Sequence, residues 1–355
     1  MNCFSKIASR FLSTVPPMSK FLSACLLIFL TLLTCTEPSH AADSQLRIGT
    51  LAPKNSLYHR QLQEIGEAWH TAQGAGSKAI VYPDGSQGGE SEMVRRMRIG
   101  QLQAALISVV GLRDIDPSIT ALQNLPLLFR SWEELDYVRE KMRPAMEKKF
   151  LDKGFVVLTW GDAGWVRFFS KEAAVRPDDY RHMKFFAWGT EQEQQSIMKS
   201  MGYTPVPLET ADILPSMQTG MVNVVPATPY FALASQIYTI APHMLEINWA
   251  PIVGALVITT KAWDAMPPAT QAALHAAADK AGTQMRAQAR REVDEAVDAM
   301  KKRGLITHKP NAAEMQEWNA LAETLYPRIR GTMVPADTFD EVFRHVKAYR
   351  QAQPK

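Results

Sequence analysis

The chain contains very little cysteine, and none after residue 35. Its three cysteines, Cys3, Cys25 and Cys35, lie in or beside an apolar run over residues 21–35. Basic residues precede this run, and small residues up to Ala41 follow it. A basic start, a short apolar core and a small-residue exit are typical of a secretory signal peptide, and the run is shorter than the roughly 20 residues that span a bilayer. We expect residues 1–41 to be removed, which leaves an exported chain without cysteine.

Other interpretations of this segment stay open. Cys25 fits a lipid-attachment pattern but precedes the apolar core, whereas Cys35 is well placed but follows Thr34, where a smaller residue is needed. A lipid anchor at either cysteine, or an uncleaved run in the membrane, therefore stays open. Met18 could be the true start, because Lys20 and the apolar run already make a complete signal. We expect a periplasmic protein whose stability depends on its core, since it has no disulfides.

The exported chain, residues 42–355, also lacks a strong net charge. The first 41 residues carry three basic and one acidic side chain, so the formal charge of +3 becomes +1. A value this small excludes a strong field for nucleic acid or for an anionic membrane. No Gly/Ser linker, low-complexity segment or internal repeat is present. A chain of this length usually forms two domains, here joined by backbone crossings rather than by a tether.

The common catalytic and metal-binding motifs are missing. There is no GxSxG, HExxH or P-loop, and no GxGxxG opens a helix. Seven histidines follow the signal, and no two have the spacing of two to four residues that a local metal site would show. A thiol nucleophile is excluded, whereas a triad of distant residues stays open. We therefore predict a protein that is not an enzyme and that uses no cofactor or metal.

Short apolar stretches alternate with amphipathic ones. Strands are predicted at 46–51, 78–82, 104–110, 155–160, 184–188, 205–208, 222–225 and 256–259. Amphipathic helices separate them; one begins with a capping box at Ser131 and Glu134 and ends near Gly154. This alternation predicts an α/β fold with parallel sheets and helical crossovers.

The longest predicted helix begins after Pro267 and continues to Gly304. About 35 residues at ~1.5 Å each give roughly 50 Å, which exceeds one domain. The predicted boundaries are 42–165 plus 255–300 for domain I and 166–254 plus 301–355 for domain II, with a ligand cleft between them. Ligands of open α/β sheets bind at the carboxyl ends of strands, and two hinged domains can close on a small molecule. Without catalytic motifs, this arrangement indicates an exported solute receptor.

Several segments together resemble one known family. They are Gly85-x-x-Gly88-x-Glu90 leading to Arg96-x-Arg98-x-Gly100, residues 124–129, Lys184–Trp188, residues 213–223, Trp249-Ala250-Pro251 and Ala262-Trp263. In this order the chain resembles the solute-binding proteins of tripartite ATP-independent periplasmic (TRAP) transporters, of the dicarboxylate-receptor (DctP) type, over residues 46–349. The resemblance implies a type II-like periplasmic binding protein with two α/β domains, a hinged cleft and a long helix across both. It also implies capture of an organic anion and its delivery to integral membrane subunits, without catalysis or ATP.

One position departs from the family pattern. The family carries an arginine in a Lys-x-Arg-Val-type strand, where the guanidinium fork binds a ligand carboxylate through two hydrogen bonds. Phe186 occupies that place in Lys184–Trp188. We therefore expect a ligand with an aromatic or apolar body rather than a dicarboxylate or sugar acid bound in the usual way.

Four aromatic side chains are candidates for the cleft. Phe186, Trp188 and Trp160 lie at or near the ends of predicted strands, and Trp249 lies at a domain crossing. A flat indole with an N–H donor suits an extended apolar acid, although core packing is the commoner use of tryptophan.

Four further side chains complete the candidate site. Thr228 precedes a proline where the family places a polar ligand-bonding side chain, and Tyr230 follows that proline. Glu90 lies at a predicted helix start, where helix capping is an equal alternative. Arg167 could clamp a carboxylate, but the family arginine near this strand aligns with Val166, and a shift of one residue reverses the face.

We thus expect a monomeric periplasmic receptor that captures a small organic acid by domain closure and delivers it to TRAP membrane subunits, with no nucleic-acid partner. Three alternatives stay open. The same receptor could feed a signalling partner, an enzyme could use this fold and would show turnover, or a metal ion could assist binding and would make it sensitive to chelators.

Overall fold

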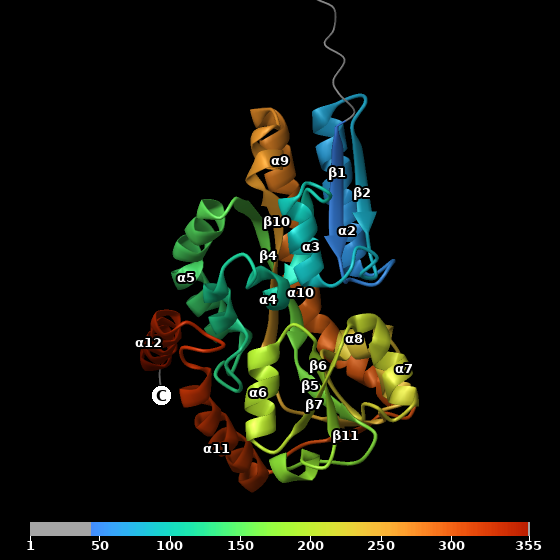
Figure 1. Ribbon diagram of the computed structural model, residues 1–355, viewed down its shortest axis with the longest axis vertical. Coiled ribbons are helices and arrows are strands. Elements are labelled where there is room, and N and C mark those ends of the chain that lie inside the picture. The colour runs from blue at the N-terminus through green and yellow to red at the C-terminus, as the bar shows by residue number, and fades with distance from the viewer. Residues whose placement is uncertain (1–43, 354–355) are drawn as a thin grey trace, which may run out of the picture. The chain divides into compact units, whose positions relative to one another are not determined.

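The computed structural model describes residues 44–353, which form two β-sheets with helices packed on them (Figure 1). The predicted signal peptide, with all three cysteines, lies outside the described residues. One sheet has five strands in the order β2-β1-β3-β10-β4. Its strands are β1 (Gln45–Thr50), β2 (Lys78–Tyr82), β3 (Ala104–Ser108), β4 (Phe155–Trp165) and β10 (Pro251–Thr259).

The second sheet has six strands in the order β11-β9-β5-β8-β6-β7. They are β5 (Arg167–Ser170), β6 (Lys184–Trp188), β7 (Thr204–Leu208), β8 (Val224–Ala227), β9 (His243–Leu245) and β11 (Ile306–His308). All eight predicted strands are present within a few residues of the expected bounds. The short strands β5, β9 and β11 are not among the eight, because segments of three or four residues show no clear periodicity.

Both sheets are mixed, which corrects the prediction of parallel sheets. β1 is parallel to β2 and β3, and β6 is parallel to β7 and β8. β10, however, is antiparallel to β3 and β4, and β5 is antiparallel to β8 and β9. These antiparallel strands flank two chain crossings between the sheets. There the Val166 amide donates to the Ala250 carbonyl at 2.8 Å, and the Trp249 amide donates to the Val166 carbonyl at 3.0 Å.

Helices cover the five-stranded sheet. They are α2 (Leu57–Gln73), α3 (Glu90–Arg98), α4 (Val109–Leu112), α5 (Trp132–Asp152) and α9 (Thr260–Asp264), with the 3-10 turn η1 (Pro117–Leu122). The predicted start of α5 is confirmed, because Ser131 Oγ accepts the Glu134 amide at 3.3 Å, and Gly154 follows the helix at a φ of 85°. The second half of the capping box is replaced: Glu134 Oε2 accepts the amide of Arg130, and Oε1 accepts from Arg350 at 2.6 Å.

Shorter helices follow the strands of the six-stranded sheet. They are α6 (Gln192–Ser200), α7 (Ile213–Gln218) and α8 (Pro229–Ala234), with the 3-10 turns η2 (Pro177–Tyr180), η3 (Thr210–Asp212) and η4 (Ile237–Thr239). The hydroxyl of Thr228 caps α8 by accepting the Phe231 amide at 3.4 Å, and Pro229 occupies the first helical position, where its missing N–H is not needed.

One helix, α10 (Pro268–Lys301), packs on both sheets, as predicted. Leu274 and Met285 belong to the core of the five-stranded sheet, whereas Val297 and Met300 belong to the core of the six-stranded sheet. Gly282 allows the close approach of α10 to β4, because a Cβ at this position would overlap Thr159 Oγ1.

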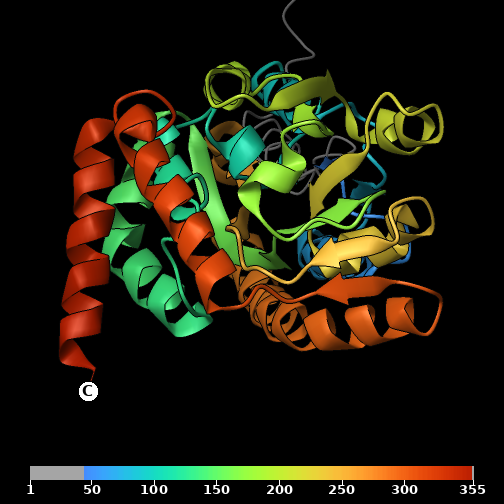
Figure 2. The ribbon, with the colours of Figure 1, turned by 90° about the horizontal axis from the view of Figure 1, so that it is seen from below.

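The last two helices are α11 (Ala312–Ile329) and α12 (Ala336–Ala352). Trp318 of α11 packs in the core beside β5 and β6, whereas Ile329 of the same helix packs in the core around α5. α12 lies beside α5 (Figure 2). The assignment of residues 301–355 to domain II stays a prediction. Within residues 44–353, no helix has the length and apolarity of a membrane span.

Candidate ligand-binding site

A cavity of about 220 Å³ lies between the two sheets. Thr50 and Ser108, the last residues of β1 and β3, line it from the five-stranded sheet. Trp188 and Ala227, the last residues of β6 and β8, line it from the six-stranded sheet. The cavity therefore lies at the carboxyl ends of these strands, which is where ligands bind in open α/β sheets.

Five of the eight candidate residues line this cavity: Phe186, Trp188, Thr228, Tyr230 and Glu90. The rings of Phe186 and Trp188 meet edge to face, with centroids 4.9 Å apart. The Thr228 hydroxyl accepts a backbone amide as a helix cap, so its O–H can still donate a hydrogen bond. Tyr230 of α8 meets Tyr58 of α2 edge to face at 6.1 Å. That contact joins helices that belong to different sheets.

Glu90 is buried and already holds several donors. Its carboxylate accepts the amide of Ser108 at 2.9 Å, the hydroxyl of Ser108 at 2.6 Å and the amide of Gly111 at 2.9 Å. Burial raises the pKa of Glu90, although these three hydrogen bonds act in the opposite direction. Gly111 is required here, because a Cβ would lie 2.7 Å from the Cβ of Glu90. Glu90 thus connects α3 to the β3–α4 junction at the edge of the cavity.

Arg167 lies outside the residues that line the cavity. It shares a face of β5 with Phe169, opposite to Val166 and Phe168, because side chains alternate along a strand. Its Nε is buried and has no hydrogen-bond partner among the described residues. Burial lowers the pKa of Arg167, while the negative charges of Glu246 and Asp294 act to raise it.

Trp160 and Trp249 lie elsewhere. Trp160 is buried in the core around α5, where its ring meets Phe150 and its Nε1 donates to Glu147 at 2.8 Å. Trp249 lines a second cavity, of about 200 Å³, next to the first. The structure therefore places neither tryptophan in the wall of the first cavity.

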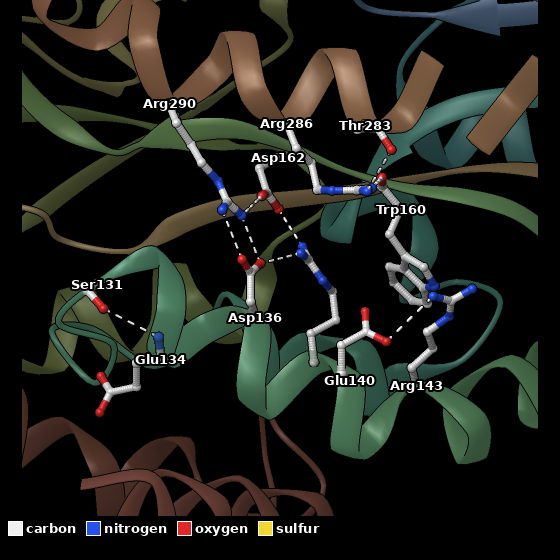
Figure 3. A network of polar contacts seen from close by, with 11 residues as sticks. Ser131, Glu134, Asp136, Glu140, Arg143, Trp160, Asp162, Thr283, Arg286 and Arg290 are labelled. Carbon is white, nitrogen blue, oxygen red and sulfur yellow. Dashed lines mark hydrogen bonds and ion pairs between the residues drawn. The ribbon is translucent and has the colours of Figure 1, made fainter. Parts of the chain in front are cut away.

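Asp162 and Asp136 are the centres of a network of ion pairs, shown in Figure 3. Asp162 of β4 is buried and lines the cavity. Its Oδ1 pairs with Arg139 of α5 at 2.6 Å and its Oδ2 pairs with Arg290 of α10 at 3.0 Å. Arg290 also pairs with Asp136 of α5 at 2.7 Å, and Arg286 of α10 donates to the Trp160 carbonyl. The carboxylate of Asp162 is thus neutralised, and the network joins α5, β4 and α10 around the site.

The wall of the first cavity contains no positive charge. None of the described residues that line it is arginine, lysine or histidine. Its two carboxylates, those of Glu90 and Asp162, are satisfied by the protein itself. A ligand would meet apolar surface and neutral hydrogen-bonding groups such as the Thr228 hydroxyl.

Some lining residues were missed by sequence reasoning. Tyr58 lines the cavity but was not among the predicted site residues. Ser108 ends β3, whereas the predicted strand continued to residue 110 and so placed Ser108 inside it. Asp162 could not be identified from a local sequence pattern, because its ion-pair partners lie 23 and 128 residues away along the chain.

Two sheets joined by two crossings and one long helix, with a cavity between their strand ends, define a solute receptor of the periplasmic binding class. The chain belongs to the bacterial extracellular solute-binding proteins of family 7, the DctP family, whose model matches residues 48–331. This confirms the predicted TRAP family. Family members are receptors for transport rather than enzymes, which agrees with the prediction that the chain is not an enzyme.

Relatives of known structure and name support this assignment. A TRAP solute-binding protein of Ralstonia eutropha with bound (S)-2-acetolactate has a TM-score of 0.79 at 17% identity, over 86% of this chain and 99% of that one. One of Shewanella oneidensis with bound succinate has a TM-score of 0.78 at 15% identity, over 86% and 100%. The C4-dicarboxylate-binding periplasmic protein DctP of Rhodobacter capsulatus is 21% identical, over 67% of this chain and 72% of that one. At these identities the structures show the fold and not the ligand.

Proposed function

We propose that this chain is a monomeric periplasmic TRAP receptor that captures a small organic acid, a monocarboxylate with an aromatic or apolar body, by domain closure. It delivers the acid to the integral membrane subunits of a TRAP transporter. The five-stranded and six-stranded sheets are the centres of the two domains, with Trp188, Phe186, Thr228, Tyr230 and Glu90 at the ligand.

The observation that carries this proposal is the cavity lined from both sheets. A ligand in it touches Ser108 on one side and Trp188 and Thr228 on the other. Such a ligand favours the closed state over the open one, because only the closed state offers both sets of contacts. The neighbours in the family bind small organic acids, which supports an acid as the ligand class.

The aromatic wall supports the narrower ligand class. Phe186 stands where the family carries its carboxylate-binding arginine, and none of the described residues that line the cavity is arginine, lysine or histidine. A dicarboxylate there would place two negative charges near Glu90 and Asp162 without a counter-charge. A single carboxylate can use the Thr228 hydroxyl, while its apolar body packs on Trp188.

The test is a thermal-shift screen of the exported protein, with C4-dicarboxylates, sugar acids, 2-oxo acids, aromatic acids and amino acids, each with and without chelator. A ligand at 100 times its Kd stabilises the protein by about 2.7 kcal/mol, which shifts the Tm by a few degrees. We expect shifts with aromatic or apolar monoacids that chelator does not change. Shifts confined to dicarboxylates would contradict the ligand class but keep the receptor, and turnover of a bound acid would contradict the receptor.

A further inference from the structure

The second cavity adjoins the first across a shared wall. Phe186, Trp188, Val166, Pro226 and Ile252 line both cavities. We refer to the cavity with Thr228 as the first chamber and to the cavity with Trp249 as the second chamber. The first chamber has a volume of about 220 Å³ and the second about 200 Å³. Together they therefore offer nearly twice the volume of the first chamber alone.

The second chamber is surrounded by aromatic rings and methionines. Trp249 meets Phe168 at a centroid distance of 5.3 Å and Trp318 at 5.7 Å. Met198 and Met201 line it as well, and the flexible methionine side chain adapts to apolar ligands of different shape. This is the surface that an alkyl or aryl group prefers.

The charges around the second chamber disfavour an anion. None of the described residues that line it is arginine, lysine or histidine. Its one lining carboxylate is that of Glu191, which already pairs with Arg113 at 2.7 Å. Asn124 Nδ2, buried and without a hydrogen-bond partner among the described residues, offers only a neutral donor. A ligand carboxylate would lack a counter-charge in either chamber, but in the first it can accept hydrogen bonds from the hydroxyls of Thr228 and Thr210.

We infer that the two chambers form one elongated binding site, and that its ligand is a monocarboxylate whose apolar chain is long enough to occupy the second chamber. The inference rests on the proposed function and narrows its ligand class. The carboxyl end lies in the first chamber, where the Thr228 hydroxyl can donate and where Thr210 Oγ1 is buried without a partner among the described residues. The apolar chain passes the wall of Phe186 and Trp188 and ends beside Trp249 and Trp318.

Titration calorimetry of the exported protein with butanoate, hexanoate and octanoate tests the chain length. Each buried methylene should improve the Kd about fourfold, so octanoate should bind far more tightly than butanoate. Octanedioate is the matched control, because it has the same length as octanoate but a carboxylate at both ends. It should bind at least 100-fold more weakly than octanoate, since one carboxylate would enter the second chamber.

Two alanines allow a matched pair of variants. Ala250 lines only the second chamber, and Ala163 lines only the first. Ala250→Phe should remove most of the gain from butanoate to octanoate, whereas Ala163→Phe should weaken both acids by similar factors. Melting curves of both variants show whether each is folded.

The Kd values of the wild type for butanoate, octanoate and octanedioate test the inference even if a variant does not fold. Octanedioate binding as tightly as octanoate would overturn the inference. Equal Kd values for butanoate and octanoate would also overturn it, but would leave the proposed function in place. If none of the monoacids bound and a sugar acid or dicarboxylate did, the ligand class of the proposed function would be wrong as well.

Discussion

At the scale of single residues, we expect the clearest consequence at Phe186, which the sequence analysis places where the family pattern has an arginine. The Phe186 side chain is 5% exposed and lies in the wall that both chambers share. Phe186→Arg would bury a guanidinium, and the carboxylates that line the two chambers, those of Glu90, Asp162 and Glu191, already have partners. An uncompensated buried charge is costly, so we expect the affinity for apolar monoacids to fall by more than tenfold. Calorimetry with octanoate measures this effect.

Phe186→Leu is the control for the Phe186 prediction, because it removes the ring without adding charge and should weaken binding less. Melting curves separate a loss of affinity from a loss of folding. Tighter binding of the same acid by Phe186→Arg would show that the place of Phe186 in the wall, or the class of the ligand, is wrong.

Residue-scale prediction from sequence succeeds where strand ends mark the site. Trp188 and Thr228 directly follow or end apolar runs, so their position at the cavity could be expected from the parallel pairing of β6 and β8. The position of Trp318 at the second chamber could not be expected, because Trp318 belongs to α11, which follows Trp188 by more than 100 residues along the chain. Phe186 was recognised only because the family pattern places an arginine there.

At the scale of elements, the contact of α10 with β4 depends on Gly282. Glycine inside a helix is usually about 1 kcal/mol worse than alanine, so Gly→Ala in open space stabilises. Here the added Cβ would overlap Thr159 Oγ1, and overpacking of this kind costs about 1–3 kcal/mol. We expect Gly282→Ala to lower the Tm by a few degrees in calorimetric melting.

Two controls accompany the Gly282 prediction. Gln284→Ala changes an exposed position of the same helix and should alter stability by less than about 0.5 kcal/mol. Thr159→Ala combined with Gly282→Ala should recover part of the loss, because it removes the overlapping atoms. A Tm of Gly282→Ala above that of the wild type would show that α10 can move away from β4 without cost.

Elements themselves were predictable, but their directions were not. The apolar runs located eight strands and the 3–4 spacing located α10, since burial on one or two faces leaves a trace in local sequence. The direction of β10 beside β3 is set by the return of the chain from the other sheet. No local pattern records such a return, and this is why parallel sheets were expected.

At the scale of the whole molecule, two contacts join the elements of the two sheets beside the chambers. Tyr58 and Tyr230 meet beside the first chamber, and Arg113, which follows α4, pairs with Glu191 at the start of α6 at 2.7 Å beside the second. Arg113 also pairs with the more exposed Glu193 at 3.2 Å. In the proposed closed state, the Arg113–Glu191 pair would be made as the domains meet, so it should contribute to closure and hence to affinity.

Arg113→Ala should therefore weaken ligand binding, because closure would bury the Glu191 carboxylate without its partner. Burial already raises the pKa of Glu191, while Arg113 acts to lower it, so the closed state favours the protonated acid still more when Arg113 is absent. A raised pKa means that the stability of the closed state is fully present below the usual pKa of glutamate and is lost as the pH rises. The defect of Arg113→Ala should thus be largest near pH 8 and shrink toward pH 5, as calorimetry at several pH values would show. Glu193→Ala, which leaves the Arg113–Glu191 pair intact, should have a smaller and pH-independent effect on ligand affinity.

Small-angle scattering should show a smaller radius of gyration of the wild type when ligand is added, and a weaker change for Arg113→Ala at the same ligand concentration. An unchanged radius of gyration in the wild type would contradict closure, whereas a defect of Arg113→Ala that does not vary with pH would contradict the role of Glu191.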